Sequence, residues 1–247
     1  MQVIQKENSQ VAARFAAAHA TDLLKKGLAQ KVPALFLTSG GSGMNILDYI
    51  DPNVLTSSLT VGLLDERFSE DPTVNSFAQL TKHPFFGAAS QKGVSFIDTR
   101  ISGKEKLMAR VDGASELAVR MEYSYKNWKE HNLGGKIYII QGIGTDGHTA
   151  GIMPYPNDPE GFQKLFERPN YWTVGYDAKG KNQYRYRATV TNTFLRNAVD
   201  MSIAYAVGEE KKAALARVTS GADPVHAVPA RVMHEMKEVY LYTDVRG

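Results

Sequence analysis

Three short segments of this 247-residue chain combine glycines with side chains that bind anions or transfer protons. The first is TSGGSG at Thr38–Gly43, between an apolar run and a helix signal. Its glycines let backbone N–H groups converge on an anion, and its serine hydroxyls add donors. It lacks the GK[ST] ending of a P-loop, and Met44 stands where a nucleophile elbow requires glycine. We expect a phosphate-binding loop, the alternative being a flexible turn, and its candidate residues are Ser39, Gly40, Gly41 and Ser42.

The charged segment Asp65-Glu66-Arg67 directly follows the apolar run Leu59–Leu64. In α/β proteins, ligands bind beyond the carboxyl ends of the strands, so charged side chains at this point are candidates for ligand contact. We expect Asp65 and Arg67 to make such contacts. The alternative is a solvated turn with a local ion pair.

The third segment, GIGTDGHTA at Gly142–Ala150, follows the most convincing strand signal and carries a histidine directly after its third glycine. The glycine spacing matches G-x-G-x-x-G, but no acidic residue ends a following strand about 20 residues later, as dinucleotide binding requires. Histidine titrates near neutral pH, so His148 fits a general base that Asp146 orients. A purely structural histidine is the alternative. The spacing of His, Asp and Glu predicts no metal site.

Two cations further along the chain complete the set of candidates. Arg187 begins the strand signal RATVT, and Lys211 falls in the first turn of an expected helix, where the helix dipole disfavours a cation. One interpretation is that Glu209 and Glu210 compensate this charge locally. The other is that Lys211 faces an anionic ligand that it shares with the glycine loop.

These segments need a scaffold, and alternating strand and helix signals predict one. Expected strands lie at Ala34–Thr38, Leu59–Leu64, Val94–Asp98, Lys136–Ile140, Trp172–Tyr176, Arg187–Thr191, Ile203–Val207 and Glu238–Thr243. Four helices are expected. The first has Ser9 as its N-cap and stops at Gly27, and the second lies around Met44–Ile50. The third fills much of Lys104–Glu130, and the fourth spans Glu209–Ser220. This succession predicts an α/β fold with a mostly parallel, Rossmann-like sheet and helices on both faces. We expect a single domain over residues 1–247, with the candidate loops at one edge of the sheet.

Composition restricts the classes of function. The chain has 29 Lys and Arg against 26 Asp and Glu, and a net charge of +3 is too small to argue for nucleic acid or a membrane surface. The absence of cysteine excludes disulfides, thiolate metal sites and cysteine nucleophiles. No apolar run reaches the roughly 20 residues of a membrane helix, and the N-terminus carries no signal-peptide pattern. We expect a cytoplasmic protein, a monomer or small homo-oligomer, without nucleic-acid or membrane partners.

Taken together, the motifs resemble those of the 6-phosphogluconolactonase family, which is related to the glucosamine-6-phosphate deaminases. The matches follow the family order along nearly the whole chain: Ser39–Ser42, Asp65–Arg67 with Asn75, Gly142–Ala150 with Pro154, Arg187–Thr189 and Gly208–Lys211. The resemblance implies hydrolysis of 6-phospho-D-glucono-1,5-lactone to 6-phosphogluconate, in the oxidative branch of the pentose phosphate pathway. It implies a sugar-phosphate substrate and no metal or cofactor.

The resemblance also implies residue roles. His148 would activate water for attack on the lactone carbonyl, assisted by Asp146. Arg67, Arg187 and Lys211 would hold the phosphate, with donors from the Ser39–Ser42 loop. The segment before Arg187 departs from the family pattern, because it lacks prolines and is rich in cations. That departure leaves Arg185 as an alternative to Arg187.

Two other functions stay open. A glucosamine-6-phosphate deaminase would share these motifs, but its pattern carries a glutamate for ring opening five residues after the histidine, where this chain has Met153. A non-catalytic sugar-phosphate-binding homologue would keep the pocket without turnover. Turnover of the lactone separates these possibilities.

Overall fold

The computed structural model describes residues 1–246 and contains a seven-stranded sheet in which every pair of neighbouring strands is parallel. The predicted α/β fold with a mostly parallel sheet is confirmed. Residue 247 lies outside the described residues, and the single domain expected over 1–247 stays a prediction. The strands lie in the order β1 (Gln2–Gln5), β10 (Val239–Thr243), β9 (Met201–Tyr205), β6 (Lys136–Gly142), β2 (Ala34–Thr38), β3 (Leu59–Leu63) and β5 (Ser95–Phe96).

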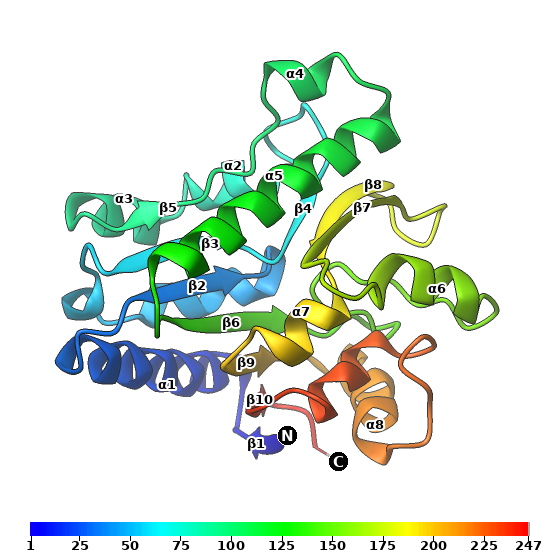
Figure 1. The fold of residues 1–247 in the computed structure, drawn as a ribbon. Helices are drawn as coiled ribbons and strands as arrows, with labels where there is room; N and C mark the ends of the chain where they lie inside the picture. The colour runs from blue at the N-terminus through cyan, green and yellow to red at the C-terminus, as the bar shows by residue number, and fades with distance from the viewer. Residues whose placement is uncertain (247) are drawn as a thin grey trace.

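Side chains of the central strands alternate between two hydrophobic cores, one on each face of the sheet. In β2, Leu35 and Leu37 belong to one core, whereas Ala34 and Phe36 belong to the other. A strand that is buried on both faces reads as a continuous apolar run, which is why its sequence signal is strong. Figure 1 shows α1 and α5 on opposite sides of the central strands.

The helices divide between these two cores. One core contains buried side chains from α5 (Arg110–His131), α6 (Pro159–Phe166), α7 (Asn192–Asn197), α8 (Lys212–Ser220) and the 3-10 helix η4 (Pro229–His234). The other contains buried side chains from α1 (Ser9–Ala29), α2 (Ser76–Leu80), α3 (Pro84–Gln91) and the 3-10 helices η1 (Gly41–Tyr49) and η2 (Pro52–Val54). Two further short elements are α4 (Gly103–Lys106) and the 3-10 helix η3 (Glu209–Lys211). Within residues 1–246, no helix has the length and apolar character needed to cross a membrane.

A second, three-stranded antiparallel sheet corrects the expectation for two strands and one loop. Its strands are β4 (Asp65–Arg67), β8 (Tyr186–Val190) and β7 (Thr173–Asp177), in the order β4-β8-β7. The loop of residues 178–185 is too short for the crossover that parallel strands need, so β7 and β8 form a hairpin instead. The charged segment expected as a loop is thus an edge strand of this sheet.

Several helix boundaries also differ from expectation. The N-cap of α1 is Asn8, whose side chain accepts a hydrogen bond from the Val11 N–H at 2.9 Å, so the prediction of Ser9 is wrong. The helix also continues through Gly27 to Ala29. The long helix expected within Lys104–Glu130 is divided into α4 and α5, and the one expected at Glu209–Ser220 is divided into η3 and α8.

The register of the parallel strands brings the candidate loops to one edge of the sheet. Thr38 at the end of β2 pairs with Leu63 of β3 on one side and with Ile140 of β6 on the other. Gly142 at the end of β6 pairs with Tyr205 at the end of β9. The segments that follow β2, β3, β6 and β9 are therefore neighbours in space.

Candidate functional site

A pocket of about 200 Å³ lies where these segments meet. Every residue predicted for the site lines it except Asp146, whose carboxylate instead contacts a lining side chain, His148. The predicted residues that line the pocket are Ser39, Gly40, Gly41, Ser42, Asp65, Arg67, His148, Arg187 and Lys211.

The glycine loop after β2 is held close to the neighbouring segments. The Ser39 N–H donates to the carbonyl of Ile140 at 2.9 Å, which fixes the loop against the end of β6. A side chain at Gly40 would begin 3.0 Å from the Ser76 hydroxyl, and Gly41 has a φ of 65°, so both positions favour glycine. The Ser39 Oγ is buried and has no hydrogen-bond partner among residues 1–246. This loop therefore presents a hydroxyl and a helix start to the pocket.

The β4–β8 ladder places two arginines opposite each other. Arg67 pairs with Arg187 across the ladder, an arrangement in which like charges repel. Arg187 is buried and forms an ion pair with Asp65. Burial alone would lower the pKa of Arg187, but the Asp65 carboxylate and the nearby charges outweigh it, so the guanidinium stays charged. The Nε atoms of Arg67 and Arg187 are buried without a hydrogen-bond partner among the described residues, so each arginine at the pocket has an unsatisfied donor.

Lys211 lies in η3, one residue before α8, and is half-buried at the pocket. The local ion pair in this turn joins Glu209 to Lys212 at 3.6 Å. The Lys211 backbone N–H donates to the Gly208 carbonyl at 2.9 Å, but in the part of the chain that the structure describes its ammonium group has no hydrogen bond or ion pair. Neither Glu209 nor Glu210 forms an ion pair with Lys211 among the described residues, which disfavours the interpretation that they compensate its charge and leaves the ammonium group available to a ligand.

His148 is held by the loop that follows β6. Its Nδ1 lies 2.6 Å from Asp146 Oδ1, and its backbone N–H donates to the same oxygen at 3.1 Å. Because a carboxylate only accepts, Nδ1 carries the proton, and Nε2 keeps the lone pair that a base needs. Burial alone would raise the pKa of Asp146, but hydrogen bonds and charge from His148 outweigh it and lower that pKa. The imidazole is 30% exposed, so it is open to a substrate.

The glycine pattern of this loop is explained by the histidine ring. A side chain at Gly144 would begin 2.0 Å from His148 Nδ1, so only glycine leaves room for the imidazole. The ring thus occupies the space through which the dinucleotide fingerprint brings a pyrophosphate to the backbone. This geometry disfavours the dinucleotide interpretation. Among residues 1–246, no group of three or more His, Asp or Glu could hold a metal ion.

The structure separates the two competing arginines. Arg185 forms an ion pair with Asp177 at 2.7 Å, and its side chain is 57% exposed. It does not line the pocket, whereas Arg187 does. The geometry therefore favours Arg187 as the pocket cation.

Sequence reasoning missed Ser76, and it named Glu66 as part of the charged segment without giving it a role. Ser76 starts α2 and lines the pocket. The Glu66 carboxylate lies behind it and accepts from the backbone N–H groups of Arg67, Ser76 and Phe77 at 2.7, 2.6 and 2.9 Å, and from the Thr99 hydroxyl at 2.9 Å. Burial raises the pKa of Glu66 to about 7, although these four hydrogen bonds act in the opposite direction. The helix cap at Asn75 is the sequence signal that could have indicated α2.

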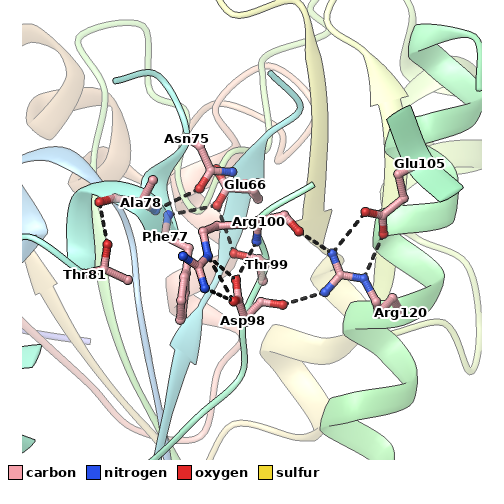
Figure 2. Close-up of polar contacts among 10 residues, drawn as sticks. All are labelled: Glu66, Asn75, Phe77, Ala78, Thr81, Asp98, Thr99, Arg100, Glu105 and Arg120. Carbon is pink, nitrogen blue, oxygen red and sulfur yellow. Dashed lines mark hydrogen bonds and ion pairs between the residues drawn. The ribbon is translucent and has the colours of Figure 1, made fainter. Parts of the chain in front are cut away.

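Figure 2 shows how Glu66 joins the charged strand to its surroundings. The carboxylate connects β4, the start of α2 and Thr99. Arg120 of α5 in turn binds Glu105 at 2.8 Å and the carbonyl of Asp98 at 2.5 Å, which fixes the segment that carries Thr99. The backbone of the pocket is therefore held from behind by a polar network that is buried at Glu66 and partly exposed at Arg120.

Comparison with known proteins gives a family and a fold. The family model described as glucosamine-6-phosphate isomerases/6-phosphogluconolactonase matches residues 7–241. A 6-phosphogluconolactonase structure from Shewanella baltica OS155 has 17% identity and a TM-score of 0.74, covering 98% of this chain and 97% of that chain. The Trypanosoma brucei 6-phosphogluconolactonase has 16% identity and a TM-score of 0.75, with coverages of 98% and 95%. No curated protein gives a significant match. Because the model spans nearly the whole sequence, the chain belongs to the glucosamine-6-phosphate isomerase/6-phosphogluconolactonase family.

Proposed function

We propose that this protein hydrolyses 6-phospho-D-glucono-1,5-lactone to 6-phosphogluconate in the pocket at the carboxyl edge of the sheet. The observation that supports this most is that one pocket combines an imidazole oriented by a carboxylate with three cationic side chains. The reaction is the second step of the oxidative pentose phosphate pathway, to which we assign the protein. We propose a cytoplasmic location with it.

The charge of the pocket suits a phosphate. Besides His148, its charged lining residues are Arg67, Arg187, Lys211 and Asp65, which leave two positive charges. A phosphate monoester carries about −1.5 to −2 at neutral pH. Each charge-assisted hydrogen bond contributes about 1.5–3 kcal/mol. These contacts anchor the sugar at its phosphate and leave its lactone carbonyl for the histidine.

In the proposed mechanism, His148 acts as a general base and then as an acid. Its Nε2 takes a proton from water while the water oxygen bonds to the lactone carbonyl carbon, giving a tetrahedral intermediate. The intermediate collapses, the bond from this carbon to the ring oxygen breaks, and the imidazolium returns the proton to that oxygen. Asp146 stabilises the imidazolium in between. A δ-lactone is already an activated ester, so a positioned base worth about 10²–10⁴-fold is sufficient for much of the acceleration.

The test is hydrolysis of freshly prepared lactone, measured against its spontaneous rate. We expect the wild type to exceed that rate and His148→Ala to lose about 10²–10⁴-fold in kcat while it still binds 6-phosphogluconate. His131→Ala is the matched control, because His131 lies on the exposed side of α5 and outside the pocket. A wild type that does not exceed the spontaneous rate refutes the proposal, and an unchanged His148→Ala variant removes the base from it.

The deaminase alternative is disfavoured by the position of Met153. The family pattern for ring opening requires an acidic group there, and in this structure Met153 is a fully buried core residue. Release of ammonia from glucosamine 6-phosphate would nonetheless overturn this argument. Binding of 6-phosphogluconate without lactone turnover would favour the non-catalytic homologue.

A further inference from the structure

The loop between β7 and β8, residues 178–185, contacts both arginines of the pocket without lining the pocket itself. The Tyr184 ring lies under the guanidinium of Arg67, with the Cζ atom 4.1 Å from the ring centroid. The Asn182 side-chain oxygen accepts from Arg187 Nη1 at 3.5 Å and from the Tyr184 backbone N–H at 2.9 Å. One asparagine thus connects the buried arginine to the residue that supports the other.

Fewer polar contacts hold the side chain of Arg67 than that of Arg187, so Arg67 depends more on the loop between β7 and β8. Asp65 pairs with Arg187, and no carboxylate pairs with Arg67 among the described residues. The Arg67 side chain donates a single hydrogen bond there, to the carbonyl of Val74 at 3.4 Å, and its Nε is buried without a partner. The Arg67 guanidinium therefore has one long hydrogen bond and a like charge opposite it on β8, and the ring of Tyr184 is a further contact that holds it in place.

An aromatic ring and a carboxylate differ in how many N–H donors of an arginine they leave free for a ligand. A carboxylate would occupy N–H donors of Arg67 and cancel its charge, and it would compete with a phosphate for both. A ring face attracts the cation through its quadrupole and uses none of the five N–H donors. The contact therefore orients the guanidinium and keeps its hydrogen bonds available to an anion.

We propose that Tyr184 is a positioning residue that holds Arg67 for the phosphate, and that it thereby sets the preference for phosphorylated over unphosphorylated lactones. Asn182 connects this contact to Arg187, because its side-chain oxygen accepts hydrogen bonds from Arg187 and from the backbone N–H of Tyr184. The proposal rests on the function proposed above and adds a specificity element outside the pocket lining.

The experiment compares Tyr184→Phe, Tyr184→Leu and Tyr184→Ala on 6-phosphogluconolactone and on unphosphorylated D-glucono-1,5-lactone. We expect Tyr184→Ala to raise KM for the phosphorylated lactone about 5- to 10-fold with kcat within about 2-fold, and to leave kcat/KM for the unphosphorylated lactone unchanged. Tyr184→Phe keeps the ring and should resemble the wild type. Tyr184→Leu fills the space without a ring face and should resemble Tyr184→Ala. Gln183→Ala, an exposed neighbour in the same loop, is the matched control.

A double-mutant cycle shows whether Tyr184 acts through Arg67. In an Arg67→Ala background, adding Tyr184→Ala should raise KM no further. A further rise there, a Tyr184→Leu variant with wild-type KM, or equal losses on both lactones would each overturn the proposal.

Binding of 6-phosphogluconate, measured by calorimetry, separates failure of this proposal from failure of the proposed function. If the wild type binds the product and hydrolyses the lactone while Tyr184→Ala has unchanged affinity, only the role of Tyr184 is refuted. If the wild type binds the product without turnover, the Tyr184 variants still test the positioning role through their dissociation constants. If the wild type binds neither the product nor inorganic phosphate, both proposals are refuted.

Discussion

Glu66 is a fully buried carboxyl whose ionisation opposes folding, and Glu66→Gln tests the balance between burial and hydrogen bonding. Four donors surround its two oxygens, as Figure 2 shows in part. Burial nevertheless raises the pKa of Glu66 from 4.5 to about 7. Removing the charge while keeping the shape of the side chain isolates this effect.

The sign and size of the expected effect follow from linkage. Between pH 4.5 and about 7, the folded state holds a proton on Glu66 that the unfolded state has lost. The contribution of Glu66 to stability is therefore present below the lower value and is lost as the pH rises to the upper one. At about 1.4 kcal/mol for each unit between 4.5 and about 7, the full loss is about 3.5 kcal/mol. Glutamine does not titrate, so Glu66→Gln lacks this loss.

The assay is urea unfolding of both proteins at about pH 5 and about pH 8. We expect the stability difference to move by about 2–3 kcal/mol in favour of Glu66→Gln at the higher pH, because other groups titrate equally in both proteins. The glutamine N–H₂ faces a donor and costs stability, but equally at both pH values. Glu70→Gln, at an exposed position nearby, should show no such movement. A constant difference, or one that moves toward the wild type, would mean that the four hydrogen bonds outweigh burial.

Three further predictions concern the pocket. Lys211→Ala should raise KM more than it lowers kcat, because the phosphate is bound in both ground and transition states; a steady-state analysis that finds KM unchanged would place Lys211 outside the phosphate site. Asp146→Asn should lower kcat by about 10²-fold or more with a small change in KM, since the amide can favour the wrong tautomer of His148; wild-type kcat would count against the oriented base. Gly144→Ala should displace the imidazole, since the new carbon would lie 2.0 Å from Nδ1, and rapid-mixing kinetics should show lost turnover with 6-phosphogluconate binding retained.

The central strands could be predicted from the sequence because their environment is uniform. Ala34–Thr38 is a strand with the predicted bounds, and Lys136–Ile140 forms most of β6. Both are apolar runs whose side chains enter cores on the two faces of the sheet. Their neighbours along the chain are loops with glycine, so the candidate residues could be found by their place after a strand.

The second sheet could not be predicted because its strands pair over a long sequence separation and its strand Asp65–Arg67 is charged. Asp65–Arg67 has no apolar periodicity, and its partner strand β8 lies more than a hundred residues later, so no local pattern indicates β4. The opposition of Arg67 and Arg187 follows only from this register. For the same reason the sequence indicated Arg67 as a ligand contact but gave no sign of Tyr184, which lies outside every motif and contacts the arginine only in the folded chain.

The three cations of the pocket are held by three different means, and each follows from where its backbone lies. Arg187 is on a central strand and buried, and a buried charge without a partner is costly, so it requires Asp65. Arg67 is on the edge strand and half-buried, so the face of an aromatic ring is sufficient. Lys211 is half-buried on a 3-10 turn whose other two residues are exposed, so water can solvate its ammonium group. An entering phosphate thus finds free N–H donors on these cations, and no hydrogen bond within the protein has to break before it binds. The free-energy cost of rearranging the site on binding is therefore small.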